Sequence, residues 1–220
     1  MTGAVLWDLD GTLIDSEEFH WLSWRDIMAA EGLPITYEQF VASFGHRNDE
    51  ILPLWLGAEA TSERIERISL AKESLYRDMI RAEGLKPLAG AAPWVETLHH
   101  DKWAQAIASS APRANIDVVL EVLGFGEFFQ AIVSAEDVTR GKPDPQVFLV
   151  AAERVTETAD RCIVVEDSPA GVEGARRAGM RTIGVNAVKD LSADLAVHSL
   201  ADLPDNAFRN LLATAPASGS

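Results

Sequence analysis

Short apolar runs alternate with helix-period segments along most of this chain. Between the later runs, apolar residues recur every three to four positions, which is the period of an amphipathic helix. Uninterrupted apolar runs are typical of strands buried on both faces, and strands that alternate with helices form parallel βαβ units. The pattern therefore predicts an α/β protein built on a doubly wound, Rossmann-like parallel sheet. The predicted strands lie at residues 4–7, 103–109, 131–133, 162–166 and 182–185, with a shorter one at 196–197.

Local capping signals place the helices of this α/β part. Asp144-Pro145 and Ser168-Pro169 each supply an N-cap residue followed by a proline, which is favoured at the first helical position. Gly179 marks the end of the helix that Ser168 begins. We expect helices over residues 92–100, 113–123, 144–155, 168–178 and 205–212.

The segment 15–86 has a different character, because it shows helical periodicity and no strand pattern apart from an extended piece near Ile35. A helix over 17–31 carries His20 and Trp24 on one stripe. Thr36 to Gln39 has the form of a capping box, and Thr61 or Ser62 begins a longer helix that ends at Gly84. The stripe of this longer helix comprises Ile65, Ile68, Lys72, Leu75 and Met79, so a lysine interrupts an apolar face.

These patterns predict two structural parts and a tail. We expect an α/β core made of residues 1–14 and 87–212, with an all-helical cap at 15–86 inserted into it. Residues 213–220 are small, polar and aperiodic, which predicts a flexible tail.

Composition and charge exclude several classes of protein. The chain has 220 residues, of which 47% are hydrophobic, so it is long enough to bury a full core. A formal net charge of −15 argues against a nucleic acid or an anionic membrane as partner. We find no leader pattern and no membrane-length apolar stretch, and we expect a cytoplasmic protein, monomeric or weakly dimeric. The single cysteine, Cys162, lies in an apolar run and is expected to be buried rather than reactive.

Polar groups follow four of the predicted strands at their carboxyl ends. In a parallel sheet these ends meet along one edge, where ligands bind. Each group alone has an ordinary explanation, namely an Asp-Gly turn, a helix-start serine, a solvated loop lysine and an acidic turn. Together they provide a carboxylate nucleophile, a hydroxyl, a cation and a metal-binding acid pair, which phosphoryl transfer requires. They are Asp8 and Asp10, Ser109, Lys142 in the loop after the third run, and Glu166 with Asp167.

In these motifs the sequence resembles the haloacid dehalogenase superfamily, in its phosphatase and β-phosphoglucomutase-like branch with a helical cap. The resemblance covers essentially the whole folded chain. Four motifs match in order, which are Asp8-Leu9-Asp10-Gly11-Thr12, Ser109, Gly141-Lys142-Pro143-Asp144-Pro145 and Glu166-Asp167-Ser168-Pro169-Ala170-Gly171.

The resemblance implies a role for each motif residue. Asp8 is implied to form an aspartyl-phosphate, and Asp10 to protonate the leaving oxygen and then activate water. Mg2+ is implied to bind the Asp8 carboxylate, the Asp10 backbone carbonyl and Asp167, with Glu166 nearby. Ser109 and Lys142 are implied to bind the transferring phosphoryl group. An acid at position 10 favours phosphate esters over halides and phosphonates, whose cleavage leaves no alkoxide to protonate.

Residues of the predicted cap indicate which kind of substrate the protein binds. His20, Trp24 and Lys72 match positions of the β-phosphoglucomutase cap, whereas Arg47 is displaced by one residue from the basic position of its specificity loop. His20 and Lys72 equally fit packing and snorkelling roles. We assign His20, Arg47 and Lys72 to substrate binding, with Arg47 as the contact for a second anionic group.

The resulting hypothesis is an Mg2+-dependent phosphatase for a small phosphorylated metabolite, specifically a sugar phosphate. A phosphosugar mutase of the β-phosphoglucomutase type is the alternative enzyme. A non-catalytic binding module on the same fold is a third reading, disfavoured by the intact acid, lysine and metal positions.

Overall fold

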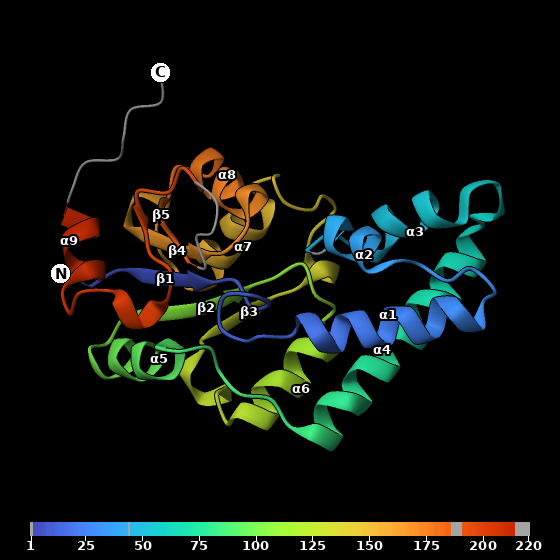
Figure 1. Cartoon of the computed structure of the whole chain (residues 1–220). Coiled ribbons are helices and arrows are strands. Elements are labelled where there is room, and N and C mark those ends of the chain that lie inside the picture. Colours follow the sequence, from blue (N-terminus) through green and yellow to red (C-terminus); the bar gives the residue numbers. More distant parts are fainter. Residues whose placement is uncertain (1, 44, 186–190, 214–220) are drawn as a thin grey trace.

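A computed structural model, which describes residues 2–43, 45–185 and 191–213, contains one parallel six-stranded sheet. The strand order is β3-β2-β1-β4-β5-β6, so the first strand of the chain lies in the middle (Figure 1). The predicted doubly wound α/β sheet with an inserted helical cap is confirmed. The strands are β1 (Ala4–Trp7), β2 (Ala104–Ala108), β3 (Ala131–Val133), β4 (Cys162–Glu166), β5 (Arg181–Gly184) and β6 (Leu195–Ala196).

Helices cover both faces of the sheet, which explains the continuous apolar runs (Figure 1). One face packs against α5 (Ala91–His100), α6 (Arg113–Leu123) and α9 (Ala207–Ala213). The other packs against α7 (Gln146–Arg154) and α8 (Pro169–Arg177). The described residues also contain five short 3-10 turns, one in the cap segment, η1 (Gly57–Glu59), and four in the α/β part, η2 (Gly126–Phe128), η3 (Ala135–Asp137), η4 (Ala159–Arg161) and η5 (Leu200–Asp202).

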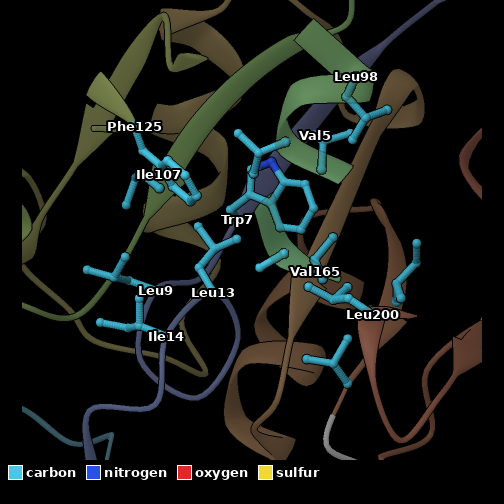
Figure 2. Close-up of a cluster of buried hydrophobic side chains, with 14 of the residues drawn as sticks. Val5, Trp7, Leu9, Leu13, Ile14, Leu98, Ile107, Phe125, Val165 and Leu200 are labelled. Carbon is cyan, nitrogen blue, oxygen red and sulfur yellow. The ribbon is translucent and has the colours of Figure 1, made fainter. Parts of the chain in front are cut away.

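The side chains of β1 alternate between the two hydrophobic cores. Val5 and Trp7 join the core on the α5 side, whereas Ala4 and Leu6 join the core on the α7 side. Figure 2 shows Trp7 surrounded by aliphatic side chains from neighbouring strands and helices. Its indole nitrogen donates a 3.0 Å hydrogen bond to the buried amide of Gln105, so no polar atom of the ring is left unpaired.

The cap consists of α1 (Glu17–Ala30), α2 (Tyr37–Ser43), α3 (Asn48–Leu56) and α4 (Ser62–Glu83), inserted between β1 and α5. No strand occurs in the described residues from 15 to 86, and the piece near Ile35 forms none. Thr36 and Gln39 exchange side-chain and backbone hydrogen bonds as the capping-box pattern predicts, and Thr61 caps α4. The C-terminal half of α4 packs against α6 of the core. Tyr76 and Ile80 of α4 form an apolar cluster there with Val118 of α6.

The structure corrects several details of the sequence interpretation. The buried stripe of α4 runs through Ile68, Lys72, Tyr76 and Ile80, whereas Leu75 and Met79 are only half-buried. The stripe shifts because α4 packs first against α1 and then against α6. Helix α3, with Pro53 inside it, was not distinguished from its surroundings in the sequence.

Smaller differences concern helix ends and the tail. Helix α7 begins at Gln146 rather than at Pro145, while the Asp144 carboxylate still accepts a 3.1 Å hydrogen bond from the Gln146 N–H. Ala213 belongs to α9, and the rest of the predicted flexible tail lies outside the described residues. The domain boundaries inferred from the sequence stay a prediction.

Two findings concern the classes considered from the composition. Among the described residues, no helix combines the length and the apolar character that crossing a membrane requires. Cys162 is buried, and this burial raises the pKa of its thiol to about 12. The thiol is therefore protonated at neutral pH and is a poor nucleophile.

Candidate active site

The register of the sheet brings the four motif segments to one edge. Trp7 pairs with Ile107 on one side and with Val165 on the other, so Asp8 follows β1 at the level where β2 and β4 also end. The Asp8 N–H donates to the carbonyl of Val165 at 3.0 Å, and the Ser109 N–H donates to the carbonyl of Val133 at 3.0 Å. These backbone bonds fix both side chains at the carboxyl edge. Ser109 Oγ accepts from the Ala111 N–H at 3.0 Å, which leaves its own hydroxyl proton to donate to a ligand.

Lys142 joins the first and fourth motifs. Its Nζ lies 2.5 Å from Asp8 Oδ1 and 2.6 Å from Glu166 Oε1, and all three side chains are buried or nearly so. Burial opposes the charge on Lys142, but the two carboxylates outweigh it and raise the pKa of the lysine. Burial also raises the pKa of Asp8, and Lys142 offsets this only in part. Lys142 therefore stays protonated beside Asp8, whose burial this single cation does not fully offset.

A group of three carboxylates in the same cluster could hold a metal ion. Asp8, Glu166 and Asp167 each offer one oxygen, and these oxygens lie within 4.8 Å of one another. Burial, and then the charge of Glu166, raises the pKa of Asp167 to about 7, which reflects the cost of crowding these anions. A hard divalent cation prefers oxygen ligands and would offset the repulsion, so the donor set fits Mg2+.

Two glycines provide the space that this acidic group needs. Gly11 has a φ of +82°, and a Cβ there would overlap the Asp167 carboxylate. A Cβ at Gly171, in the first turn of α8, would overlap the carboxylate of Glu166. Glu166 Oε2 also accepts from the N–H and the hydroxyl of Ser168, both at 2.8 Å. The glycines of the first and fourth motifs thus leave room for the carboxylates of Asp167 and Glu166.

Asp10 is held apart from this cluster by groups from the cap side. Ser16 Oγ donates to Asp10 Oδ1 at 2.5 Å, and His20 Nε2 lies 3.3 Å from the same oxygen. Burial would raise the pKa of Asp10, but the hydrogen bonds from His20 and Ser16 outweigh it and lower the pKa. Asp10 is therefore ionised in this arrangement and has the form of a general base.

Lys72 of α4 forms a second buried cluster with residues of α1, α3, α4 and α6. Its Nζ lies 2.8 Å from His20 Nδ1 and 2.9 Å from Glu73 Oε1. Asn48 donates to Glu73 at 2.7 Å, and Asn115 of α6 donates to the other oxygen of Glu73 at 2.5 Å. The cluster therefore connects Asp10, through His20, to the cap and then to the core.

A cavity of about 330 Å³ lies between the strand ends and the cap. All nine residues selected from the sequence line it. This volume lies at the low end of the range for small-molecule sites, which is roughly 300–1,000 Å³. The nine residues are Asp8, Asp10, His20, Arg47, Lys72, Ser109, Lys142, Glu166 and Asp167.

Arg47 reaches the cavity wall with its guanidinium already engaged. It forms a bidentate ion pair with Asp49, in which Nε and Nη2 donate to the two carboxylate oxygens at 3.0 and 3.2 Å. Its Nη1 donates to the carbonyl of Ala135 at 3.0 Å. A Cβ at Gly141 would lie 3.1 Å from Arg47 Cδ, so this arginine packs against the loop that carries Lys142. Arg47 therefore lines the cavity, while its guanidinium nitrogens donate hydrogen bonds to Asp49 and Ala135.

Several residues of these networks were missed by sequence reasoning. Ser16, Glu73 and Asn115 are polar residues with no motif spacing that distinguishes them from surface positions. Glu73 offered one signal, since it follows Lys72 on a helix whose apolar stripe the lysine already interrupts. Asp49 lies only two residues after Arg47, but its pairing with Arg47 depends on how α3 begins.

Comparisons with known proteins identify the class. The haloacid dehalogenase-like hydrolase family matches residues 5–185, so this chain belongs to that family and is a hydrolase. The resemblance inferred from the four motifs is confirmed. The fructose-1-phosphate phosphatase YqaB of Escherichia coli is 29% identical, over 83% of this chain and 95% of that protein. The beta-phosphoglucomutase of Bacillus subtilis is 30% identical, over 91% of each chain.

A solved structure shows the same fold. The beta-phosphoglucomutase (pgmB) from Clostridium difficile matches this chain with a TM-score of 0.87 and 24% identity. The match covers 96% of this chain and 97% of that chain, so the similarity includes the cap as well as the sheet.

Proposed function

We propose that this protein is an Mg2+-dependent phosphatase that hydrolyses the phosphate ester of a small carbohydrate through a phosphorylated Asp8. The observation that carries the proposal is the position of Lys142 Nζ, 2.5 Å from Asp8 and 2.6 Å from Glu166, beside Asp167. A nucleophile, a fixed cation and an acid pair that fits a metal converge at one point, as phosphoryl transfer requires. Relatives named as a sugar phosphate phosphatase and a sugar phosphomutase support the carbohydrate substrate.

The reaction takes place in two displacements at phosphorus. In the first, an Asp8 oxygen attacks phosphorus, the ester P–O bond breaks, and Asp10 gives a proton to the leaving oxygen. Because Asp10 is ionised without substrate, it must take up this proton as substrate binds. In the second, Asp10 removes a proton from water, which attacks phosphorus and releases Asp8 and inorganic phosphate.

Other residues hold the phosphoryl group while its bonds change. Lys142 Nζ and the Ser109 hydroxyl donate to its oxygens and stabilise the charge that develops there. Glu166 positions Lys142, since it accepts from Nζ at 2.6 Å. A bound Mg2+ would supply positive charge that offsets the repulsion between the carboxylates and the phosphate.

The test is phosphate release from p-nitrophenyl phosphate and from a panel of sugar monophosphates, with Mg2+ and with EDTA. We expect turnover with Mg2+, and a loss of about 100-fold or more with EDTA. Asp8→Asn should lower kcat by about 10,000-fold or more, because the nearly isosteric amide cannot attack phosphorus. Turnover that survives both Asp8→Asn and EDTA would contradict the mechanism.

A sugar phosphomutase is the second candidate, and the similarity to the beta-phosphoglucomutase of Bacillus subtilis supports it. A mutase returns the phosphoryl group from Asp8 to a second hydroxyl before water takes it. Formation of glucose 6-phosphate from β-glucose 1-phosphate, dependent on glucose 1,6-bisphosphate and faster than phosphate release, would favour the mutase. A cytoplasmic location and a monomeric or weakly dimeric state stay predictions.

A further inference from the structure

The cavity wall is strongly acidic for a site that receives a phosphate. Among the residues that the structure describes, seven carboxylates line it, against three side chains of lysine and arginine. A divalent cation at Asp8 and Asp167 reduces the excess without reversing it. A second phosphate on the substrate therefore needs a cation of its own, placed in the part of the cavity under the cap.

Two of these three cations, Lys142 and Lys72, are already paired with other groups and are not placed to bind a second phosphate. Lys142 lies between Asp8 and Glu166, where the transferring phosphate binds. Lys72 Nζ is paired with Glu73 at 2.9 Å and with His20 at 2.8 Å, and its side chain is only 2% exposed. It also lies 5.2 Å from the Trp24 ring centroid, so an aromatic ring covers the ammonium.

Arg47 is the third of these three described cations, and each of its guanidinium nitrogens donates to a protein atom. Nε and Nη2 donate to the two oxygens of Asp49, and this pair raises the pKa of the arginine. Nη1 donates to the carbonyls of Ala135 at 3.0 Å and Val138 at 3.5 Å. A second phosphate would have to displace a chelating carboxylate that stays nearby as a repulsive charge.

We propose that the Arg47–Asp49 pair restricts this enzyme to substrates with a single phosphate, whose remaining part is uncharged. The pair determines specificity because Asp49 neutralises the arginine that would otherwise bind a distal phosphate. In the same position, Arg47 bridges the cap to the loop after β3, which carries Lys142. The proposal rests on the phosphatase function proposed above and names the class of its substrate.

The neutral part of the cavity wall agrees with such a substrate. Trp24 and Phe40 contribute aromatic side chains to the lining, and Ser43 and Ser69 contribute hydroxyl groups. Apolar walls with a few hydrogen-bonding groups are typical of sites for small uncharged moieties. A polyol or sugar with one phosphate fits this lining, with the phosphate at the strand ends and the uncharged part under the cap.

The test compares matched pairs of compounds that differ by one phosphate. Fructose 1-phosphate and fructose 1,6-bisphosphate form one pair, and glucose 1-phosphate and glucose 1,6-bisphosphate form another. We expect kcat/KM for phosphate release to be at least about tenfold higher for the monophosphate of the pair that the enzyme accepts. Equal or faster release from the bisphosphate would overturn the proposal.

The assignment to Asp49 has its own variant and control. Asp49→Asn keeps the shape of the side chain but removes the charge that neutralises Arg47. It should shift the ratio of kcat/KM values toward the bisphosphate by about fivefold or more. Asp78→Asn makes the same change on the outer surface of α4, where the side chain is 69% exposed, and should leave the ratio unchanged. A ratio that is the same in Asp49→Asn as in the wild type would refute the role of the pair.

A binding measurement separates this proposal from the proposed function. The same pairs are titrated by calorimetry into Asp8→Asn with Mg2+, where no turnover is expected. Tighter binding of the monophosphate, by about tenfold, supports the single-phosphate site even if the wild type hydrolyses neither compound. Equal or tighter binding of the bisphosphate overturns it even if hydrolysis of sugar monophosphates is found.

Discussion

Two buried lysines lie within one cavity, and their pKa values move in opposite directions. Lys142 is held between two carboxylates, which outweigh its burial and raise its pKa. Lys72 has one carboxylate partner and a histidine, and its burial prevails and lowers its pKa. The strand-end cluster, made of Asp8, Lys142 and Glu166, therefore holds the lysine charge in place between two carboxylates. The cap cluster comprises Lys72, His20, Glu73, Asn48 and Asn115, and its contacts connect the helices of the cap to one another and to α6.

The largest difference between the clusters is expected in catalysis. Lys142→Met removes the cation that binds the transferring phosphoryl group in the proposed mechanism, and kcat/KM should fall about 1,000-fold, as for other preorganised donors. Lys72→Met should reduce kcat/KM by only about 10 to 100-fold, because it acts on Asp10 through His20. Steady-state kinetics with p-nitrophenyl phosphate and Mg2+ measure both. A greater loss in Lys72→Met than in Lys142→Met would reverse the comparison.

The same difference explains what the sequence could predict. Asp8, Ser109 and Glu166 follow apolar runs directly, so the parallel register alone brings them to one edge. Lys142 follows β3 by a longer loop, and its place in the cluster came from the motif rather than from periodicity. The alternation of runs and helices was therefore enough to predict the sheet and most of the strand-end groups.

The cap cluster was less accessible, because its contacts join residues distant in sequence without a repeating register. Asn48, Glu73 and Asn115 come from α3, α4 and α6, and only the packing of these helices brings them together. Arg47 was expected to contact substrate, and only the structure shows that Asp49 and Ala135 occupy its donors. Side-chain pairing between helices depends on rotamers and crossing geometry, which hydrophobic periodicity does not encode.

The second prediction concerns the stability of the cap cluster. Lys72→Met leaves Glu73 buried without its cation and should lower the free energy of unfolding by about 3 kcal/mol. Glu73→Gln in the same chain should restore part of this loss. The double-mutant cycle should then give a coupling energy of about 2 kcal/mol in urea unfolding.

An exposed ion pair serves as the control for that cycle. Arg113 and Asp117 on α6 lie 2.8 Å apart, but each is 52% exposed, so their coupling energy should stay below about 1 kcal/mol. A Lys72–Glu73 coupling as small as that of the control pair would mean that burial does not strengthen the contact. The cap cluster would then contribute no more than a surface ion pair.

The smallest effect is expected at a pair that lies just beyond β3 and outside both clusters. Asp137 accepts from Arg154 and from the N–H and hydroxyl of Ser134, and the Arg154 hydrogen bond lowers the pKa of the carboxyl. Because Asp137 is partly exposed, Asp137→Asn should cost only about 1 kcal/mol of unfolding free energy at pH 7. Asp26→Asn, at an exposed pair with Arg25 in α1, should change it by less than about 0.5 kcal/mol.

The pH dependence of this difference tests its cause. With a lower pKa in the folded chain, ionised Asp137 stabilises the fold fully above the pKa of the unfolded chain, about 3.9. As the pH falls below that value the unfolded chain takes up the proton first, so the advantage of the wild type over Asp137→Asn should shrink. Urea unfolding at pH 7, 5 and 3.5 measures both proteins under the same conditions. A difference that stays constant down to pH 3.5 would show that the shape of the carboxyl, rather than its charge, supports the turn after β3.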